Sequence, residues 1–211
     1  IDNGSIINHS RINPSIPTIN YLLENGARVI LMSHLGNPGG RLVPELSLEP
    51  VATHLASLPQ IGEVFLTDSC VGDGARSVIQ GLREGQVCML ENLGFHAGEA
   101  NNEDKLAKQL ASFCDIYVNE AFSLNEKMIA STCAIAKHAR LRTGGLQFAA
   151  ETAALTRILN SREKPFTMVL GGDKLLDVLD LLEKYFDSVD NLLLGGGLAN
   201  TFIAAMGGKT G

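Results

Sequence analysis

Two glycine-rich segments follow short apolar runs in the C-terminal part of the sequence. Gly171–Lys174 follows Met168–Leu170, and Gly195–Gly197 follows Leu192–Leu194. Glycines between a strand and a helix let phosphate oxygens approach main-chain N–H groups at the positive helix end, and a lysine adds charge. The segments therefore indicate phosphate or nucleotide contact, although a plain strand-to-helix turn has the same composition. Neither matches the P-loop or the dinucleotide-binding fingerprint.

A second candidate for anion binding is His34, in the glycine-rich segment Ser33–Gly40 after the run Val29–Met32. An imidazole there can donate to an anion, but a single histidine is more often structural. The remaining histidines and the four cysteines have no metal-ligand spacing, so no metal site is predicted, and the cysteines are interpreted as small apolar core residues. These residues are His9, His54, His96, His138, Cys70, Cys88, Cys114 and Cys133.

Six short apolar runs are the candidate strands that would position these segments. None alternates with polar residues, which favours parallel strands buried on both faces. Helical patterns separate most of them, so the repeat predicts an α/β fold with a doubly wound parallel sheet. Ligands bind such sheets at the carboxyl ends of the strands. The runs are Val29–Met32, Val64–Leu66, Val87–Leu90, Ile116–Val118, Met168–Leu170 and Leu192–Leu194.

The spacing of the runs breaks once, between Val118 and Met168. The gap is about twice the usual one and contains the longest helical pattern, Gly145–Asn160. We expect one sheet to end before this helix and a second to start after Pro165.

Composition narrows the possible functions. The chain has 211 residues, enough for one large or two small domains, and its 45% apolar and 19% charged residues exclude general disorder. A net charge of −6 has the wrong sign for general binding to nucleic acid or anionic membranes.

No apolar run reaches the roughly 18 residues of a membrane span, and the first residues do not resemble a signal peptide. We expect a cytoplasmic location, and a sequence that is part of a longer chain.

Several motifs together resemble the phosphoglycerate kinase family, in that family's order, from Asp2 to Gly211. Each motif alone is weak, but a chance match of all of them in one order is very improbable. The motifs are Ser10–Ile12, Ile16–Ile19, Ser33–Pro38, Ser47–Val51, Glu91–His96, Asn119–Phe122, Gly171–Lys174 and Gly195–Phe202.

The resemblance implies a two-domain kinase of Rossmann-like, three-layer architecture that is truncated at both ends. Residues 1–143 correspond to the N-terminal 3-phosphoglycerate-binding domain without its first strand, 144–161 to the interdomain helix, and 162–211 to the start of the C-terminal nucleotide-binding domain. The family's opening strand, with its Asp-x-Asn-x-Pro motif, and most of the nucleotide domain are absent from this sequence.

The resemblance also assigns site residues. Arg11 matches the catalytic arginine that stabilises the transferring phosphoryl group. The substrate-binding positions are Arg11, His34, Gly36, Asn37, Gly94 and Lys127, and the nucleotide-binding positions are Gly171, Gly172, Lys174, Gly195, Gly196 and Gly197. No residue is assigned to a metal.

Several positions depart from the family pattern. Asn37 and Gly94 stand where the family has arginines, Glu126 replaces a histidine, Lys127 replaces an arginine, and Val178 replaces a lysine. Losing a transition-state arginine can cost on the order of 10³–10⁵ in rate. These changes predict weakened substrate and nucleotide binding.

The resemblance implies reversible phosphoryl transfer between 1,3-bisphosphoglycerate and ADP, the glycolytic reaction that gives 3-phosphoglycerate and ATP, with Mg²⁺ accompanying the nucleotide. The expected protein is a monomer without nucleic-acid or membrane partners. An alternative is a catalytically impaired homologue that acts as a binding or regulatory module. A third, an unrelated α/β nucleotide-binding or oxidoreductase domain, is disfavoured because the dinucleotide fingerprint is missing.

Overall fold

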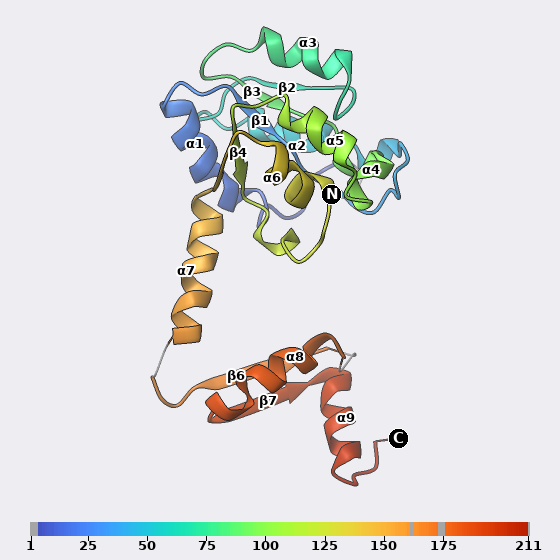
Figure 1. The fold of residues 1–211 in the computed structure, drawn as a ribbon, viewed down its shortest axis with the longest axis vertical. Coiled ribbons are helices and arrows are strands. Elements are labelled where there is room, and N and C mark those ends of the chain that lie inside the picture. Colours follow the sequence, from blue (N-terminus) through green and yellow to red (C-terminus); the bar gives the residue numbers. More distant parts are fainter. Residues whose placement is uncertain (1–3, 161–162, 173–175, 211) are drawn as a thin grey trace. The chain divides into compact units, whose positions relative to one another are not determined.

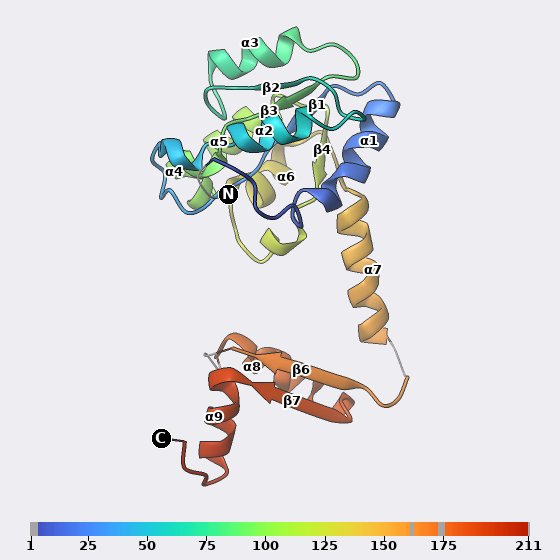
Figure 2. The same ribbon diagram turned by 180° about the vertical axis from the view of Figure 1, so that it is seen from behind.

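The computed structural model describes residues 4–160, 163–172 and 176–210. The chain divides into two compact units, Ile1–Leu155 and Thr156–Gly211. The division falls inside the long helix α7 (Leu146–Asn160), drawn in Figures 1 and 2.

In the described part of the first unit, five parallel strands form two sheets. β1 (Val29–Leu31), β3 (Val87–Met89) and β2 (Val64–Leu66) pair in the order β1-β3-β2, and β4 (Ile116–Asn119) pairs with β5 (Leu141–Gly144). The helices before α7 are α1 (Ile16–Glu24), α2 (Glu49–Ala56), α3 (Asp73–Gly81), α4 (Ala97–Ala100), α5 (Asp104–Ala111) and α6 (Ile135–His138). Short 3₁₀ turns are η1 (Asn13–Ser15), η2 (Pro44–Leu46), η3 (Leu93–Phe95) and η4 (Phe122–Leu124), and η5 (Ala130–Ala134) is a π turn.

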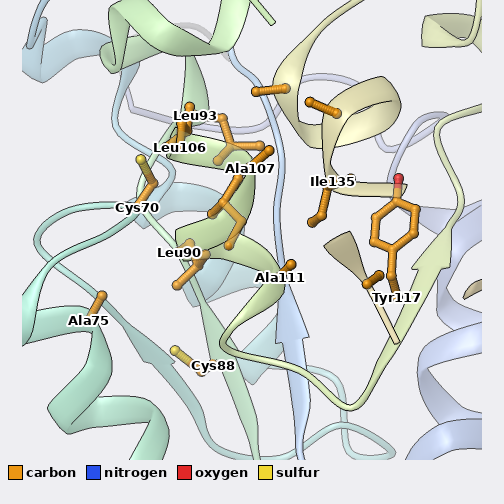
Figure 3. Close-up of a cluster of buried hydrophobic side chains, with 14 of the residues drawn as sticks. Cys70, Ala75, Cys88, Leu90, Leu93, Leu106, Ala107, Ala111, Tyr117 and Ile135 are labelled. Carbon is orange, nitrogen blue, oxygen red and sulfur yellow. The ribbon is translucent and has the colours of Figure 1, made fainter. Parts of the chain in front are cut away.

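Alternate residues of β3 and of the position directly after it enter two different cores. Val87 and Met89 belong to a cluster formed with α1 and α2, whereas Cys88 and Leu90 belong to a cluster formed with α3, α5 and α6 (Figure 3). In Figure 1 α5 lies in front of the strands and α2 behind them, and Figure 2 shows the reverse. The three-stranded sheet is thus covered on both faces, which confirms the doubly wound α/β prediction.

The described residues of the second unit form a two-stranded parallel sheet with two helices after α7. β6 (Thr167–Gly171) pairs with β7 (Asn191–Gly195), and the helices are α8 (Leu176–Tyr185) and α9 (Gly196–Ala205), with the 3₁₀ turn η6 (Phe186–Ser188) after α8. α9 packs against both strands. On the strands, Val169 is 71% and Leu193 55% exposed. The expectation of strands buried on both faces is therefore wrong for this unit, where alternate strand residues remain open to solvent.

All six predicted strands are present, but β5 was not predicted. Its sequence, Leu141-Arg142-Thr143-Gly144, contains one strongly apolar residue, and all four residues are exposed. Apolar periodicity reports burial, so it misses a strand of this kind. A break between sheets does fall at the long helix, since β5 precedes α7 and β6 follows it, but two sheets precede the helix where one was expected.

The cysteines are all free thiols. Cys70 and Cys88 are buried, as the core interpretation predicts, and burial raises the pKa of each to about 11. Cys114 and Cys133 are half-buried. Within the described ranges, no helix combines the length and the apolar character needed to cross a membrane.

Leu90 offers a test of the core assignment because it is completely buried. We expect Leu90→Ala to lower the free energy of unfolding by about 2–5 kcal/mol, since it removes packed methyl groups and leaves a cavity. Leu42→Ala is the matched control, because Leu42 is 71% exposed and should change stability by less than about 0.5 kcal/mol. Urea unfolding followed by circular dichroism measures both, and equal effects would contradict the assignment.

Candidate functional site

The loops after β1 and β3 are joined by the side chain of Asn92, which is 1% exposed. Its Oδ1 accepts hydrogen bonds from the main-chain N–H of Gly94 at 2.9 Å and of Leu35 at 3.3 Å. Its Nδ2 donates to the carbonyl oxygens of Leu35 at 2.8 Å and Leu46 at 2.9 Å. One buried amide therefore pairs main-chain groups of Leu35, Leu46 and Gly94 from the two connections that follow β1 and β3, a role that the sequence analysis missed.

The glycines beside Asn92 are constrained by close neighbours. Gly36 has φ +62°, and a Cβ there would lie 2.8 Å from the Leu46 side chain. A Cβ on Gly94 would lie 2.9 Å from Cγ of Pro38. The Gly94 carbonyl accepts from Gly40 N at 3.0 Å. At position 94 this chain has a close contact between loops where the family has an arginine side chain.

His34 is held by a buried carboxylate. Its Nε2 lies 2.9 Å from Oε1 of Glu99, which is 3% exposed. Glu99 also accepts from Ser131, through the main-chain N–H at 3.1 Å and the hydroxyl at 2.5 Å. These contacts fix the imidazole ring and leave Nδ1 as the nitrogen for any ligand. Glu99 was not predicted as a site residue, and nothing in its local sequence identifies it.

The structure brings only two of the predicted substrate-binding residues to one cavity. Arg11 and His34 both line a cavity in the first unit, and Arg11 is exposed just before η1. Gly36, Asn37 and Gly94 lie in the adjoining loops without lining it, and Lys127 is exposed in the segment after η4, next to exposed Glu126.

Glu120, directly after β4, caps the start of α7. Its carboxylate accepts from the main-chain N–H of Phe148 at 2.9 Å and of Gln147 at 3.4 Å, and from the hydroxyl of Thr18. A negative charge at a helix N-terminus is stabilising. A Cβ on Gly145 would overlap the Glu120 carboxyl group, so glycine at 145 permits this contact. The end of β4, α1 and the first turn of α7 are thereby joined.

The glycine segments of the second unit lie side by side. Gly171 and Gly195 are partners in the register of β6 and β7. Gly172 accepts a hydrogen bond from Leu198 N at 2.8 Å, and a Cβ on Gly196, which has φ +64°, would lie 3.2 Å from Gly172 O. The N-terminus of α9 begins at this edge. Two predicted nucleotide-binding segments therefore meet at the carboxyl end of one strand pair.

Of the remaining residues on the predicted nucleotide side, the structure describes Gly197 and Val178 but not Lys174. Gly197 lies in the first turn of α9. Lys174, and Asp173 beside it, lie outside the described residues. Val178 is half-buried in α8 and offers no charge to an anion.

Parallel strands with glycine segments at their carboxyl ends, followed by a helix N-terminus, define an α/β protein with an arrangement at which phosphate groups commonly bind. The comparisons specify the class. The family model of phosphoglycerate kinase matches residues 1–211. This chain therefore belongs to the phosphoglycerate kinase family.

Two solved structures are similar to the chain. The phosphoglycerate kinase from Coxiella burnetii is 38% identical with a TM-score of 0.80, and the match covers 98% of this chain and 51% of that one. The phosphoglycerate kinase from Pyrococcus horikoshii OT3 is 32% identical with a TM-score of 0.87, with coverage of 100% and 53%. The chain thus spans about half the length of these relatives.

The role of Asn92 can be tested by truncation. We expect Asn92→Ala to lower the free energy of unfolding by about 1–3 kcal/mol, because buried main-chain groups of Leu35, Gly94 and Leu46 lose partners. Asn37→Ala, in the exposed part of the β1 loop, is the control and should have little effect. Thermal and urea unfolding measure the difference, and indistinguishable variants would refute the organising role of Asn92.

Proposed function

We propose that this chain forms part of a phosphoglycerate kinase, which transfers a phosphoryl group between 1,3-bisphosphoglycerate and ADP. The observation that carries the proposal is the meeting of two glycine segments ahead of α9, in a chain of the phosphoglycerate kinase family. The first unit would bind 3-phosphoglycerate and the second the nucleotide phosphates. The division into domains 1–143 and 162–211, joined by the helix 144–161, belongs to this proposal.

In the second unit, the N-terminus of α9 would bind phosphate oxygens. Leu198 N is paired with Gly172 O, whereas within the described ranges no partner is found for the first-turn N–H groups of Gly196 and Gly197. Glycine at these positions lets an anion approach the main chain closely. The same hydrogen bond holds Gly172 against the first turn of α9.

In the first unit, Arg11 and Nδ1 of His34 would bind the anionic substrate. A guanidinium group donates paired hydrogen bonds to phosphate or carboxylate oxygens. Toward ATP, a β-phosphate oxygen of ADP attacks the acyl phosphate; one P–O bond forms, and the bond to the carboxyl oxygen breaks. Arg11 would stabilise charge on the moving group, and Glu99 would hold His34 in place. In-line transfer requires both ligands to be held so that the attacking oxygen, the phosphorus atom and the leaving oxygen are aligned.

The Mg²⁺ that the family implies is not matched by a protein-held site in this part of the molecule. Among the described residues, no three His, Cys, Asp or Glu side chains gather as metal ligands. In our proposal the ion arrives with the nucleotide and is coordinated by its phosphates, as Mg²⁺ commonly is. No step is assigned to it here.

Family membership supports the kinase over the alternative of an impaired binding or regulatory module. The proposal also includes a monomer in the cytoplasm, without nucleic-acid or membrane partners. An acidic net charge of −6 agrees with the lack of polyanion partners.

Nucleotide binding can be tested by placing a charge in the proposed phosphate site. We expect Gly197→Asp to weaken ADP binding about tenfold by electrostatic repulsion, while the helix itself tolerates an acidic residue in its first turn. Asn200→Asp adds the same charge to α9 at an exposed position and should change the affinity far less. Isothermal titration calorimetry measures both. Equal losses in the two variants, or ADP binding unaffected by either, would contradict the assignment.

Restoring an arginine should strengthen substrate binding where the loop has room for it. Asn37 is exposed, so we expect Asn37→Arg to lower the Kd for 3-phosphoglycerate about tenfold through a charge-assisted hydrogen bond. Gly94→Arg is the comparison; its Cβ would crowd Pro38, so it should lower the unfolding temperature instead. Calorimetry and thermal unfolding separate the two effects, and an unchanged Kd in Asn37→Arg would count against this substrate site.

A further inference from the structure

Glu99, in the short helix α4, is a charged side chain in an almost water-free position, since only 3% of the residue is exposed. Its Oε2 accepts from the main-chain N–H of Ser131 at 3.1 Å, and its Oε1 accepts from the Ser131 hydroxyl at 2.5 Å. Hydrogen bonds donated to a carboxylate favour its charged form. Buried charges in proteins are paired, and Nε2 of His34 lies 2.9 Å from Oε1. His34 is therefore the partner of an ionised Glu99.

The other side of this network is held by groups that stay neutral near pH 8. The Tyr117 hydroxyl donates to the carbonyl oxygen of Ser131 at 2.9 Å. Burial and, less strongly, the Glu99 charge raise the pKa of Tyr117 to about 12. Burial, with a smaller effect of the same charge, raises the pKa of the Cys70 thiol to about 11. Neither group can supply a proton or a charge to Glu99 between pH 7 and pH 9.

The ionisable side chains of the neighbouring segments do not pair with His34 or Glu99. Among the described contacts, the ring and the carboxylate hydrogen-bond only to each other and to Ser131. The loop Ser33–Gly40 contains no ionisable side chain besides His34. The neighbouring ionisable side chains are His96 and Glu103 on either side of α4, Cys133 in η5, and Arg11, which lines the same cavity as His34.

The contact with Glu99 determines where the His34 ring carries its protons. An ionised carboxylate only accepts hydrogen bonds, so Nε2 must be protonated to pair with it. In a neutral imidazole one nitrogen donates and the other accepts, so a neutral His34 has a lone pair at Nδ1. The oxygens of a phosphate or carboxylate ligand are acceptors too, and two acceptors form no hydrogen bond. Nδ1 can therefore bind an anion only when the ring carries both protons.

We infer that His34 binds the anionic substrate as an imidazolium ion, and that Glu99 is the positioning residue that supplies its counter-charge. The inference rests on the proposed function, because it concerns the same substrate site. The second proton comes from solvent and is bound at Nδ1. Beside the ionised Glu99, a neutral ring leaves the pair with one negative charge, whereas the imidazolium leaves it with none. Substrate binding is thereby coupled to the protonation of His34.

The substitutions in the neighbouring loops increase the importance of this proton. Asn37 and Gly94 supply no charge at positions where the family has arginines. Of the predicted substrate-binding residues, Arg11 and Lys127 remain charged up to pH 9, and His34 does so only while it is protonated. Loss of the second proton therefore removes one of three cations and leaves the Glu99 charge uncompensated.

The first test is the pH dependence of 3-phosphoglycerate binding to the whole chain, measured by isothermal titration calorimetry at pH 7 and pH 9. The second ionisation of a phosphate ester lies near pH 6, so the charge of the ligand changes little in this range. We expect the Kd to rise about tenfold or more as His34 loses its second proton. His34→Gln should bind weakly at both pH values, whereas Cys133→Ser should retain the pH dependence.

The second test observes the ring directly, because ¹⁵N NMR distinguishes protonated from unprotonated ring nitrogens. We expect both nitrogens of His34 to be protonated in the complex with 3-phosphoglycerate. Glu99→Gln removes the counter-charge, so it should favour the neutral ring and raise the Kd at pH 7 about tenfold. Asp104→Asn is the matched control, because it removes the carboxylate of the exposed pair with His138 and should change neither measurement.

The measurements on the unmodified chain decide the question even if Glu99→Gln does not fold. An equal Kd at pH 7 and pH 9, a bound His34 ring with one proton, or equal effects of Glu99→Gln and Asp104→Asn would overturn the inference. Each of these results leaves the proposed function standing, because 3-phosphoglycerate still binds. A chain that binds no 3-phosphoglycerate at either pH would contradict the proposed function, and this inference with it.

Discussion

The structure depends on one requirement, that main-chain groups removed from water find hydrogen-bonding partners. Where parallel strands end, their loops leave such groups without a sheet neighbour. Asn92 pairs those of the loops after β1 and β3, and Glu120 pairs those at the start of α7. The glycines at 36, 94 and 145 follow from these contacts, because a side chain there would crowd the neighbouring loop or carboxylate. Residues of β1 and β4 also line a cavity in the first unit.

The parts of the fold that could be predicted from sequence are those where burial leaves an apolar pattern. Runs such as Val87–Met89 identify strands because both faces are covered. β5 leaves no such pattern, since Leu141–Gly144 is exposed along its whole length. Solvent exposure also explains why the strands of the second unit do not meet the expectation of two covered faces: apolar composition alone does not state which face another element covers.

The candidate site was predictable only where the local sequence contains the pattern typical of its chemistry. The glycine segments at 171–172 and 195–197 were found because a strand followed by glycines is a local pattern, and their alignment in register agrees with it. Glu99 was not found, because its partners His34 and Ser131 lie 65 and 32 residues away in sequence. The family resemblance named His34 and Asn37 together, yet the structure separates a side chain held by a buried carboxylate from one that is exposed.

In the hydrogen bond between Leu198 N and Gly172 O, the carbonyl of Gly172, directly after β6, accepts from a main-chain N–H group in the first turn of α9. A carbonyl oxygen and a phosphate oxygen both accept hydrogen bonds from main-chain N–H groups. The Gly172 carbonyl therefore occupies the N–H group of Leu198, which a bound anion would otherwise use. For the proposed anion site, this bond means that the N–H group of Leu198 is already paired and does not count among the donors that a ligand would meet. The position of the Gly172 carbonyl would thus limit the donors that the start of α9 offers in the proposed site.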